Sequence, residues 1–254
     1  MEGKNGKTNG RSLDQRDQTN GQNPAQNKDT PRVIQDLADA CVRFVERAIN
    51  FKLNFEAETL PVLDHYVDQA RKAAAERPET AALVAPAVGA YLGEIIRRKF
   101  GGFWRLEDTN DPRSFRVELE PVYLILRPIE LATRALDLPP TQPTPDAPQE
   151  KVENDEPNEN DEEDENTRDA HGAQAPKPSE DPNDDINAAI LELDEEDKQA
   201  VADKLVNMPP VPDTEYYAPS TYLEIVELIV SALRTKRSAD GMEPDAHLEP
   251  DDYS

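Results

Sequence analysis

Apolar side chains recur every three or four residues in four stretches of the N-terminal half of the chain. This spacing places them on one face of an α-helix. It predicts helices over about 31–49, 59–75, 78–100 and 128–136. Pro86 lies inside the third of these stretches, and we expect it to kink or divide that helix, because proline removes a helical hydrogen bond.

Two glycines, Gly89 and Gly93, lie four residues apart on one face of the predicted third helix. A glycine in a helix interior costs about 1 kcal/mol relative to alanine, so a pair on one face indicates a close approach by a neighbouring backbone. Charged residues border the pair at Glu94 and Arg97. This setting favours a packing notch in a soluble fold over a membrane dimerisation motif.

Alternation of apolar and polar residues replaces the helical period after Gly102. Three runs, at 103–107, 114–120 and 122–126, predict β-strands. The second run alternates strictly between apolar and polar or charged side chains, which is typical of an antiparallel strand with one buried face. A further short strand is predicted at 52–55.

The C-terminal part of the chain is predicted to be helical. Residues 186–193 suit a short amphipathic turn or helix, and 195–207 suit a longer helix. Thr221 and Glu224 have the spacing of a capping box, which predicts the start of a last helix that ends near Lys236. These apolar stripes need a partner surface, because about fifty residues form only a marginal core alone.

Together these elements predict an α+β protein, mostly helical, with a small antiparallel sheet at about 103–126 and a disordered acidic insert that interrupts the fold. The folded parts amount to one ordinary domain, or to one domain with a helical appendage. The expected segments are a disordered tail at 1–29, an α+β core at 30–140, a disordered acidic and proline-rich insert at 141–185, a helical part at 186–237 that docks on the core, and a disordered acidic tail at 238–254.

Acidic residues dominate the insert, which holds sixteen Asp and Glu against three Lys and Arg. Val152 is its one apolar side chain larger than alanine, too little to offset the entropy of ordering the segment. The net charge of −25 on the whole chain repels phosphate backbones, so we expect no nucleic-acid partner. The insert is either a solubilising spacer or a segment that attracts basic protein surfaces or cations.

The sequence gives no indication of a membrane or secreted protein. Residues 1–29 lack the apolar core of a signal peptide. The longest uncharged apolar-rich run, 80–93, is shorter than the roughly 18 residues that a spanning helix needs. Cys41 is the single cysteine, so no intrachain disulfide can form, which fits a reducing cytoplasm.

Signatures of metal binding, cofactor binding and catalysis are missing from the sequence. Of the three histidines, His171 and His247 fall in predicted disorder, and His65 has no second His or Cys one turn away. Cys41 lies on the apolar stripe of the first helix, as a small buried hydrophobe would. We therefore expect no metal and no cofactor.

One group of residues brackets the turn between the third helix and the first strand: Tyr91, Glu94, Arg98 and Trp104. It predicts either a pocket or partner surface at this corner, or a packed tryptophan beside a surface ion pair between Glu94 and Arg98. The aromatic loop at Tyr216 and Tyr217 allows a similar choice. Such a loop is either a binding anchor or a plug that closes the core.

A family resemblance rests on the run from Gly89 to Arg98 (GAYLGEIIRR), followed by Gly101-Gly102-Phe103-Trp104. It resembles the helix-then-strand signature of a group of uncharacterised bacterial domains. The segments 190–193 and 216–221 resemble parts of the same proteins, so the likeness covers about 30–136 and 186–236. It implies a shared fold; that group has no assigned reaction, so it implies no catalytic residues.

These observations favour a non-enzymatic cytoplasmic interaction or regulatory protein, such as an adaptor or an immunity-type inhibitor, with a protein as its partner. The alternative is an enzyme of unrecognised type with its site near Tyr91, Glu94 and Trp104. A deep pocket with convergent polar groups at that corner would favour the enzyme, and a flat apolar patch would favour the adaptor. The sequence leaves the oligomeric state open.

Overall fold

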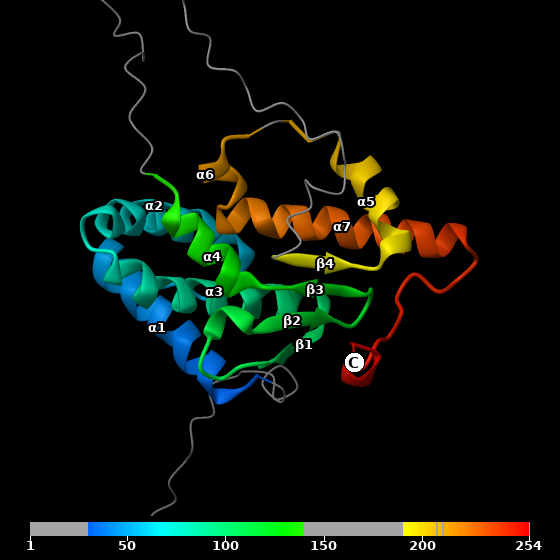
Figure 1. Ribbon diagram of the computed structural model, residues 1–254, viewed down its shortest axis with the longest axis horizontal. Coiled ribbons are helices and arrows are strands. Elements are labelled where there is room, and N and C mark those ends of the chain that lie inside the picture. Colours follow the sequence, from blue (N-terminus) through cyan, green and yellow to red (C-terminus); the bar gives the residue numbers. More distant parts are fainter. Residues whose placement is uncertain (1–29, 140–189, 207, 210, 254) are drawn as a thin grey trace, which may run out of the picture.

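The computed structural model describes residues 30–253 except 140–189, 207 and 210. The predicted tail at 1–29 and the predicted insert at 141–185 therefore lie outside the described residues. The described part combines helices with a small antiparallel sheet, which confirms the α+β class (Figure 1).

The elements follow one another in the order expected for the first half of the chain. The helices are α1 (Arg32–Ile49), α2 (Leu60–Glu76), α3 (Glu79–Phe100), α4 (Pro128–Asp137), α5 (Lys198–Leu205), α6 (Asp213–Tyr216) and α7 (Pro219–Ala239). The strands are β1 (Gly102–Arg105), β2 (Arg116–Leu119), β3 (Leu124–Leu126) and β4 (Leu191–Leu193). Short 3-10 turns lie at Ala57–Thr59, Pro112–Ser114, Glu195–Asp197 and Pro250–Tyr253.

The sheet has the order β1-β2-β3-β4, and every neighbouring pair is antiparallel. Its inner face is apolar, with Trp104 opposite Val117 and Leu124 opposite Leu193. Since successive side chains point to opposite faces, the polar residues of β1 and β2 share the outer face. The core therefore lies between the inner face of the sheet and the helices.

The fourth strand corrects the turn or helix expected at 186–193. Leu191 and Leu193 are buried on either side of the exposed Glu192, which is the period of a strand rather than a helix. β4 pairs with β3, and the carbonyl of Ile190 accepts the hydroxyl of Tyr222 at 3.0 Å. The chain after the insert thus completes the sheet as well as covering it with helices.

Helix α3 runs unbroken through Pro86 and packs against α1, α2 and α4. A Cβ at Gly89 would lie 2.6 Å from the backbone nitrogen of Ile129 in α4, closer than real Cβ contacts allow. This confirms the close approach predicted from the glycine pair. By length and composition α3 could also cross a membrane, yet 67% of its most apolar window is buried inside the fold, as in a core helix.

The stretch 52–55 is not a strand, so that expectation is corrected. Phe55 adopts a φ of 64°, in the left-handed region, which no extended strand contains. This conformation lets the Phe55 N–H donate to the hydroxyl of Tyr91 at 2.9 Å. The tertiary contact with α3 therefore replaces the local strand pattern.

Helix α7 begins at Pro219, two residues before the predicted capping box at Thr221. Its start is held instead by α2, because the Ser220 N–H donates to Asp64 Oδ1 at 3.1 Å and the Ser220 hydroxyl donates to the same carboxylate. A carboxylate at a helix N-terminus satisfies free N–H groups and complements the helix dipole. This contact docks the C-terminal helices on the first part of the chain.

The C-terminal residues correct the disordered tail expected from 238 onward. Helix α7 continues through Ala239, and the chain then returns to the sheet, where Ala246 and Leu248 donate backbone N–H groups to the carbonyls of Pro121 and Glu120. Tyr253 is only 5% exposed. One buried aromatic ring and a few backbone bonds order a segment whose composition alone favours disorder.

Candidate functional site

Glu94 is the centre of a buried polar cluster at the corner between α3 and β1, and it is only 2% exposed. Its Oε1 accepts the Arg97 Nε at 2.9 Å and the indole N–H of Trp104 at 2.8 Å. Its Oε2 accepts the Arg98 Nε at 3.2 Å. The Thr30 hydroxyl, just before α1, lies 3.2 Å and 3.3 Å from the two oxygens.

The electrostatic balance at Glu94 keeps its carboxylate ionised. Burial raises the pKa of Glu94, but the hydrogen bonds and charge of Arg97, the indole of Trp104 and the charge of Arg98 outweigh burial, so the pKa is lowered. A carboxylate with this many donors does not readily take up or release a proton near neutral pH. It holds the corner together through charge-assisted hydrogen bonds.

Tyr91 is also turned inward, with no exposed surface. Its hydroxyl accepts the Phe55 N–H and lies 3.1 Å from the Thr59 hydroxyl, while its ring packs 4.7 Å from that of Phe55. Burial raises the pKa of Tyr91 more than its hydrogen bonds and Arg98 lower it. The outer side of the same Phe55 ring carries the Arg98 guanidinium, 4.3 Å from the ring centroid.

The corner thus holds all four residues that the sequence placed there, but Arg98 and Trp104 turn their donors to Glu94, and the Tyr91 hydroxyl turns to Phe55 and Thr59. Trp104 is 7% exposed, and its ring fills the notch at Gly93, where a Cβ would lie 2.5 Å from Trp104 Cη2. The ion pair of Glu94 and Arg98, expected on the surface, has a buried carboxylate. The geometry corresponds to a structural hub rather than a cleft.

The aromatic pair at Tyr216 and Tyr217 lies elsewhere, at the N-terminal end of α7 (Figure 1). The two rings are half-buried against the core and meet edge to face, with centroids 5.1 Å apart. The hydroxyl of Tyr217 is a hydrogen-bond partner of Arg134 in α4. The pair packs between α4 and α7. It is therefore separate from the Glu94 corner, which lies beside β1.

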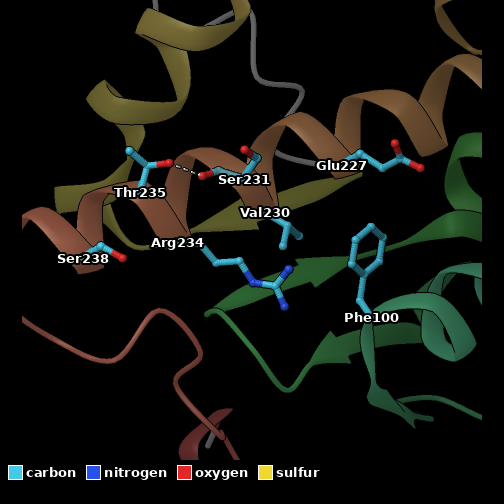
Figure 2. Close-up of a pocket in the computed structure, with 7 residues that line it drawn as sticks. All are labelled: Phe100, Glu227, Val230, Ser231, Arg234, Thr235 and Ser238. Carbon is cyan, nitrogen blue, oxygen red and sulfur yellow. Dashed lines mark hydrogen bonds between the residues drawn. The ribbon is translucent and has the colours of Figure 1, made fainter.

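Figure 2 shows a small pocket on the side of α7, about 270 Å³ in volume. The ring of Phe100 and the guanidinium of Arg234 point into it from opposite sides, with Glu227 at one end. Arg234 is already paired with Asp245 at 2.6 Å. Its hydroxyl groups belong to Ser231, Thr235 and Ser238, and the Thr235 hydroxyl donates to the Ser231 carbonyl within α7.

A larger pocket of about 440 Å³ lies between the sheet, the end of α7 and the returning C-terminal segment. Burial raises the pKa of Asp194 on its rim, and Asp197 and Glu196 add to the shift. Lys236 neutralises part of this charge through a 2.5 Å bond to Asp197. Among the residues that the structure describes, no cluster of His, Cys, Asp and Glu has the arrangement of a metal site.

The remaining candidates for reactive groups, the cysteine and the histidines, are not arranged for catalysis in the described residues. Cys41 has no exposed surface, and burial raises the pKa of its thiol, so it is the buried hydrophobe that the helical stripe predicts. His65 bonds to Gln69 at 2.8 Å on the exposed side of α2. His247 lies in the ordered C-terminal segment, which corrects its assignment to disorder, and His171 lies outside the described residues.

Sequence reasoning missed the outer face of the sheet. Glu118 in β2 has no exposed surface; its Oε1 accepts the Nε of Arg105 at 2.8 Å and the Nε of Arg116 at 2.7 Å. Its Oε2 is buried without a hydrogen-bond partner among the described residues. The signal was the strict alternation of β2, which assigned Glu118 to the polar face without showing that anything covers that face.

No family model, curated protein or solved structure matches this chain. The resemblance to uncharacterised bacterial domains stays a prediction.

Proposed function

We propose that this chain is a non-enzymatic, cytoplasmic interaction or regulatory protein, of adaptor or immunity type, whose partner is another protein. The observation that carries the proposal is the inward direction of Glu94 at the α3–β1 corner. The alternative, an enzyme with its site at this corner, needs an accessible acid, base or nucleophile. Tyr91, Glu94 and Trp104 are all buried. Glu94 bonds to Trp104 and to Thr30 just before α1, and the Tyr91 hydroxyl accepts the Phe55 N–H from the loop before α2.

The other described groups with catalytic chemistry support the same proposal. The thiol of Cys41 is buried at the centre of α1, and burial disfavours its reactive thiolate form. The exposed His65 has an amide partner, Gln69, and no carboxylate that would orient it as a base. In one described pocket the Ser220 hydroxyl donates to the Asp64 carboxylate, which also accepts the Ser220 N–H, so this carboxylate holds the start of α7. Two other described pockets are lined by mixed polar and apolar side chains.

Charge adds to the case for a protein partner. The chain carries a formal net charge of −25, and its acidic insert joins α4 to β4. A long acidic segment attracts basic protein surfaces over a distance and raises the association rate at low salt. It repels nucleic acid and anionic membranes, so a protein with a basic patch is the proposed partner class.

The test is recovery of bound proteins by a tagged, full-length chain after mild crosslinking in the cells that make it. An unrelated folded protein of the same net charge is the control, because it captures whatever binds by charge alone. We expect at least one protein to be retained in near-equal amount by this chain and not by the control. Retention of nothing beyond the control set would contradict the proposal.

A second measurement addresses the enzyme directly. If the corner is structural, Glu94→Gln lowers stability and leaves the retained partner bound at temperatures where the variant is folded. A catalytic Glu94 would give the opposite pattern, with stability kept and a chemical conversion lost.

A further inference from the structure

The C-terminal segment 242–253 returns to the end of the sheet and lies against the loop between β2 and β3 (Figure 1). Its anchor is Tyr253, whose hydroxyl lies 2.5 Å from the carbonyl of Leu119 and 3.0 Å from that of Val122, and accepts the N–H of Leu124 at 3.3 Å. The Tyr253 ring stacks on Tyr123 with centroids 4.7 Å apart. A tyrosine held at both its ring and its hydroxyl is specifically recognised.

The residues before Tyr253 are recognised through their backbone and their charge. The N–H groups of Ala246 and Leu248 donate to the loop between β2 and β3, and the Arg105 Nη2 donates to the carbonyl of Pro250 at 2.5 Å. The pKa of Arg105 is raised, first by its bond to Glu118 and also by the nearby charge of Asp251. Backbone bonds with one aromatic pocket are the usual features of peptide recognition.

The surface beneath the segment has the features of a binding site. It combines Arg105, which contacts the segment, with the aromatic rings of Phe103 and Tyr123; Arg116 in β2 is paired with Glu107 and Glu118. Between them lies Glu118, fully buried, with Oε2 unpartnered among the described residues. A buried oxygen without a donor is costly, so this face of the sheet carries more than packing requires.

The connection to α7 is an exposed helix C-cap, in which Gly241 and Met242 donate N–H groups to the carbonyls of Ser238 and Arg237. Gly241 has a φ of 76°, and a Cβ there would meet no atom within 4 Å. Asp240, Gly241 and Met242 are all exposed. The ion pair between Arg234 and Asp245 is partly exposed on both sides, and such pairs contribute little. The segment is therefore held mainly by its own docked residues, from Ala246 to Tyr253.

We propose that the outer face of the sheet is a binding surface for acidic peptide segments that carry a tyrosine, and that residues 242–253 occupy it in cis as an autoinhibitory ligand. The part of this segment that the surface recognises is Glu249-Pro250-Asp251-Asp252-Tyr253, a tyrosine preceded by acidic residues. The inference rests on the proposed function, because it names the kind of partner segment that displaces the C-terminal one. Arg105 matches the acidic residues, and Tyr123 with Phe103 matches the ring.

Tethering sets the size of the expected effect. A short linker gives the attached segment an effective concentration on the order of millimolar, so a free copy competes poorly with it. Loss of the Tyr253 anchor lifts that competition. We expect a labelled peptide with the sequence of residues 242–254 to bind the full-length Tyr253→Ala chain at least about tenfold more tightly than the unaltered chain. The same peptide with Ala in place of tyrosine is the matched control and should not bind.

Cleavage of the linker provides a test that does not depend on the variant folding. A protease site placed at the exposed residues 240–242 of the full-length chain is cut after folding. We expect the cut segment to remain bound and to exchange with added labelled peptide, while circular dichroism stays unchanged. The proposal is overturned if the folded, cut chain releases the segment and binds no peptide, or if it unfolds, since the segment is then an ordinary part of the core. Failure here leaves the co-purification result, and hence the proposed function, standing.

Discussion

Trp104 fills the notch that Gly93 leaves on α3, and the edge of its ring lies where a side chain at residue 93 would begin. The same indole donates its N–H to Glu94, the residue that follows Gly93. Helix and strand are therefore joined at one point by packing and by a charge-assisted hydrogen bond. The absence of a side chain at Gly93 allows the ring to reach its acceptor.

Replacement of Gly93 by alanine tests this packing, because the sign of the change in stability depends on it. In an open helix position Gly→Ala stabilises by about 1 kcal/mol. Here the new Cβ would overlap Trp104, so we expect a loss of about 1–3 kcal/mol, as for other overpacked sites. Urea unfolding measures it. Gly89→Ala, which meets the backbone of Ile129 instead of a ring, should cost more, and stabilisation by either change would contradict the packing described.

Removal of the charge at Glu94 should be costly, because its partners Arg97 and Trp104 remain buried. Breaking one side of a buried ion pair typically costs on the order of 3 kcal/mol, and Glu94→Gln leaves the 8% exposed Arg97 without its counter-charge. The comparison is Asp36→Asn, whose partner Arg32 is almost fully exposed and 3.9 Å away, and which should change stability little. Equal losses of unfolding free energy in urea for the two variants would contradict a structural role for Glu94.

The pH dependence of stability should report the same carboxylate. The pKa of Glu94 is lowered in the folded protein relative to its ordinary value of 4.5. Its stabilising contribution is therefore fully present above that value and is lost as the pH falls through the folded pKa. We expect the stability difference between the unaltered chain and Glu94→Gln to be constant from pH 7 to about 5 and to shrink below about 4.5. A difference that grows on acidification would contradict the assigned charge state.

Periodicity was sufficient for most of the fold. The helical stripes and the strand alternation from 103 to 126 predicted most elements of the first half, and the glycine pair predicted a close backbone approach, which α4 makes. β4 was missed because three residues are too few to show a period, and its partner β3 lies some sixty residues away in sequence. The start of α7 was missed because Asp64, distant in the chain, caps it.

The sequence predicted which residues share the α3–β1 corner, but not that their side chains point inward. Helical spacing brings Tyr91, Glu94 and Arg98 to one side of α3, but it does not show that Thr30 and Trp104 close over them. Burial of that carboxylate depends on how α1 and β1 pack, which is tertiary information. The docking of the C-terminal segment 242–253 was missed for a related reason. One tyrosine carries the anchoring, and composition averages it with eleven neighbours, of which five are acidic.

Hydrogen exchange of the full-length chain with the protein that it retains tests the central claim most directly. The claim is that this chain acts by binding a protein, and that the α3–β1 corner is scaffold. We expect faster exchange in residues 242–253 on binding, as the C-terminal segment is displaced, with residues 91–104 as protected as before. Altered exchange at 91–104 with no change at 242–253 would contradict the account and place the functional site at the Glu94 corner.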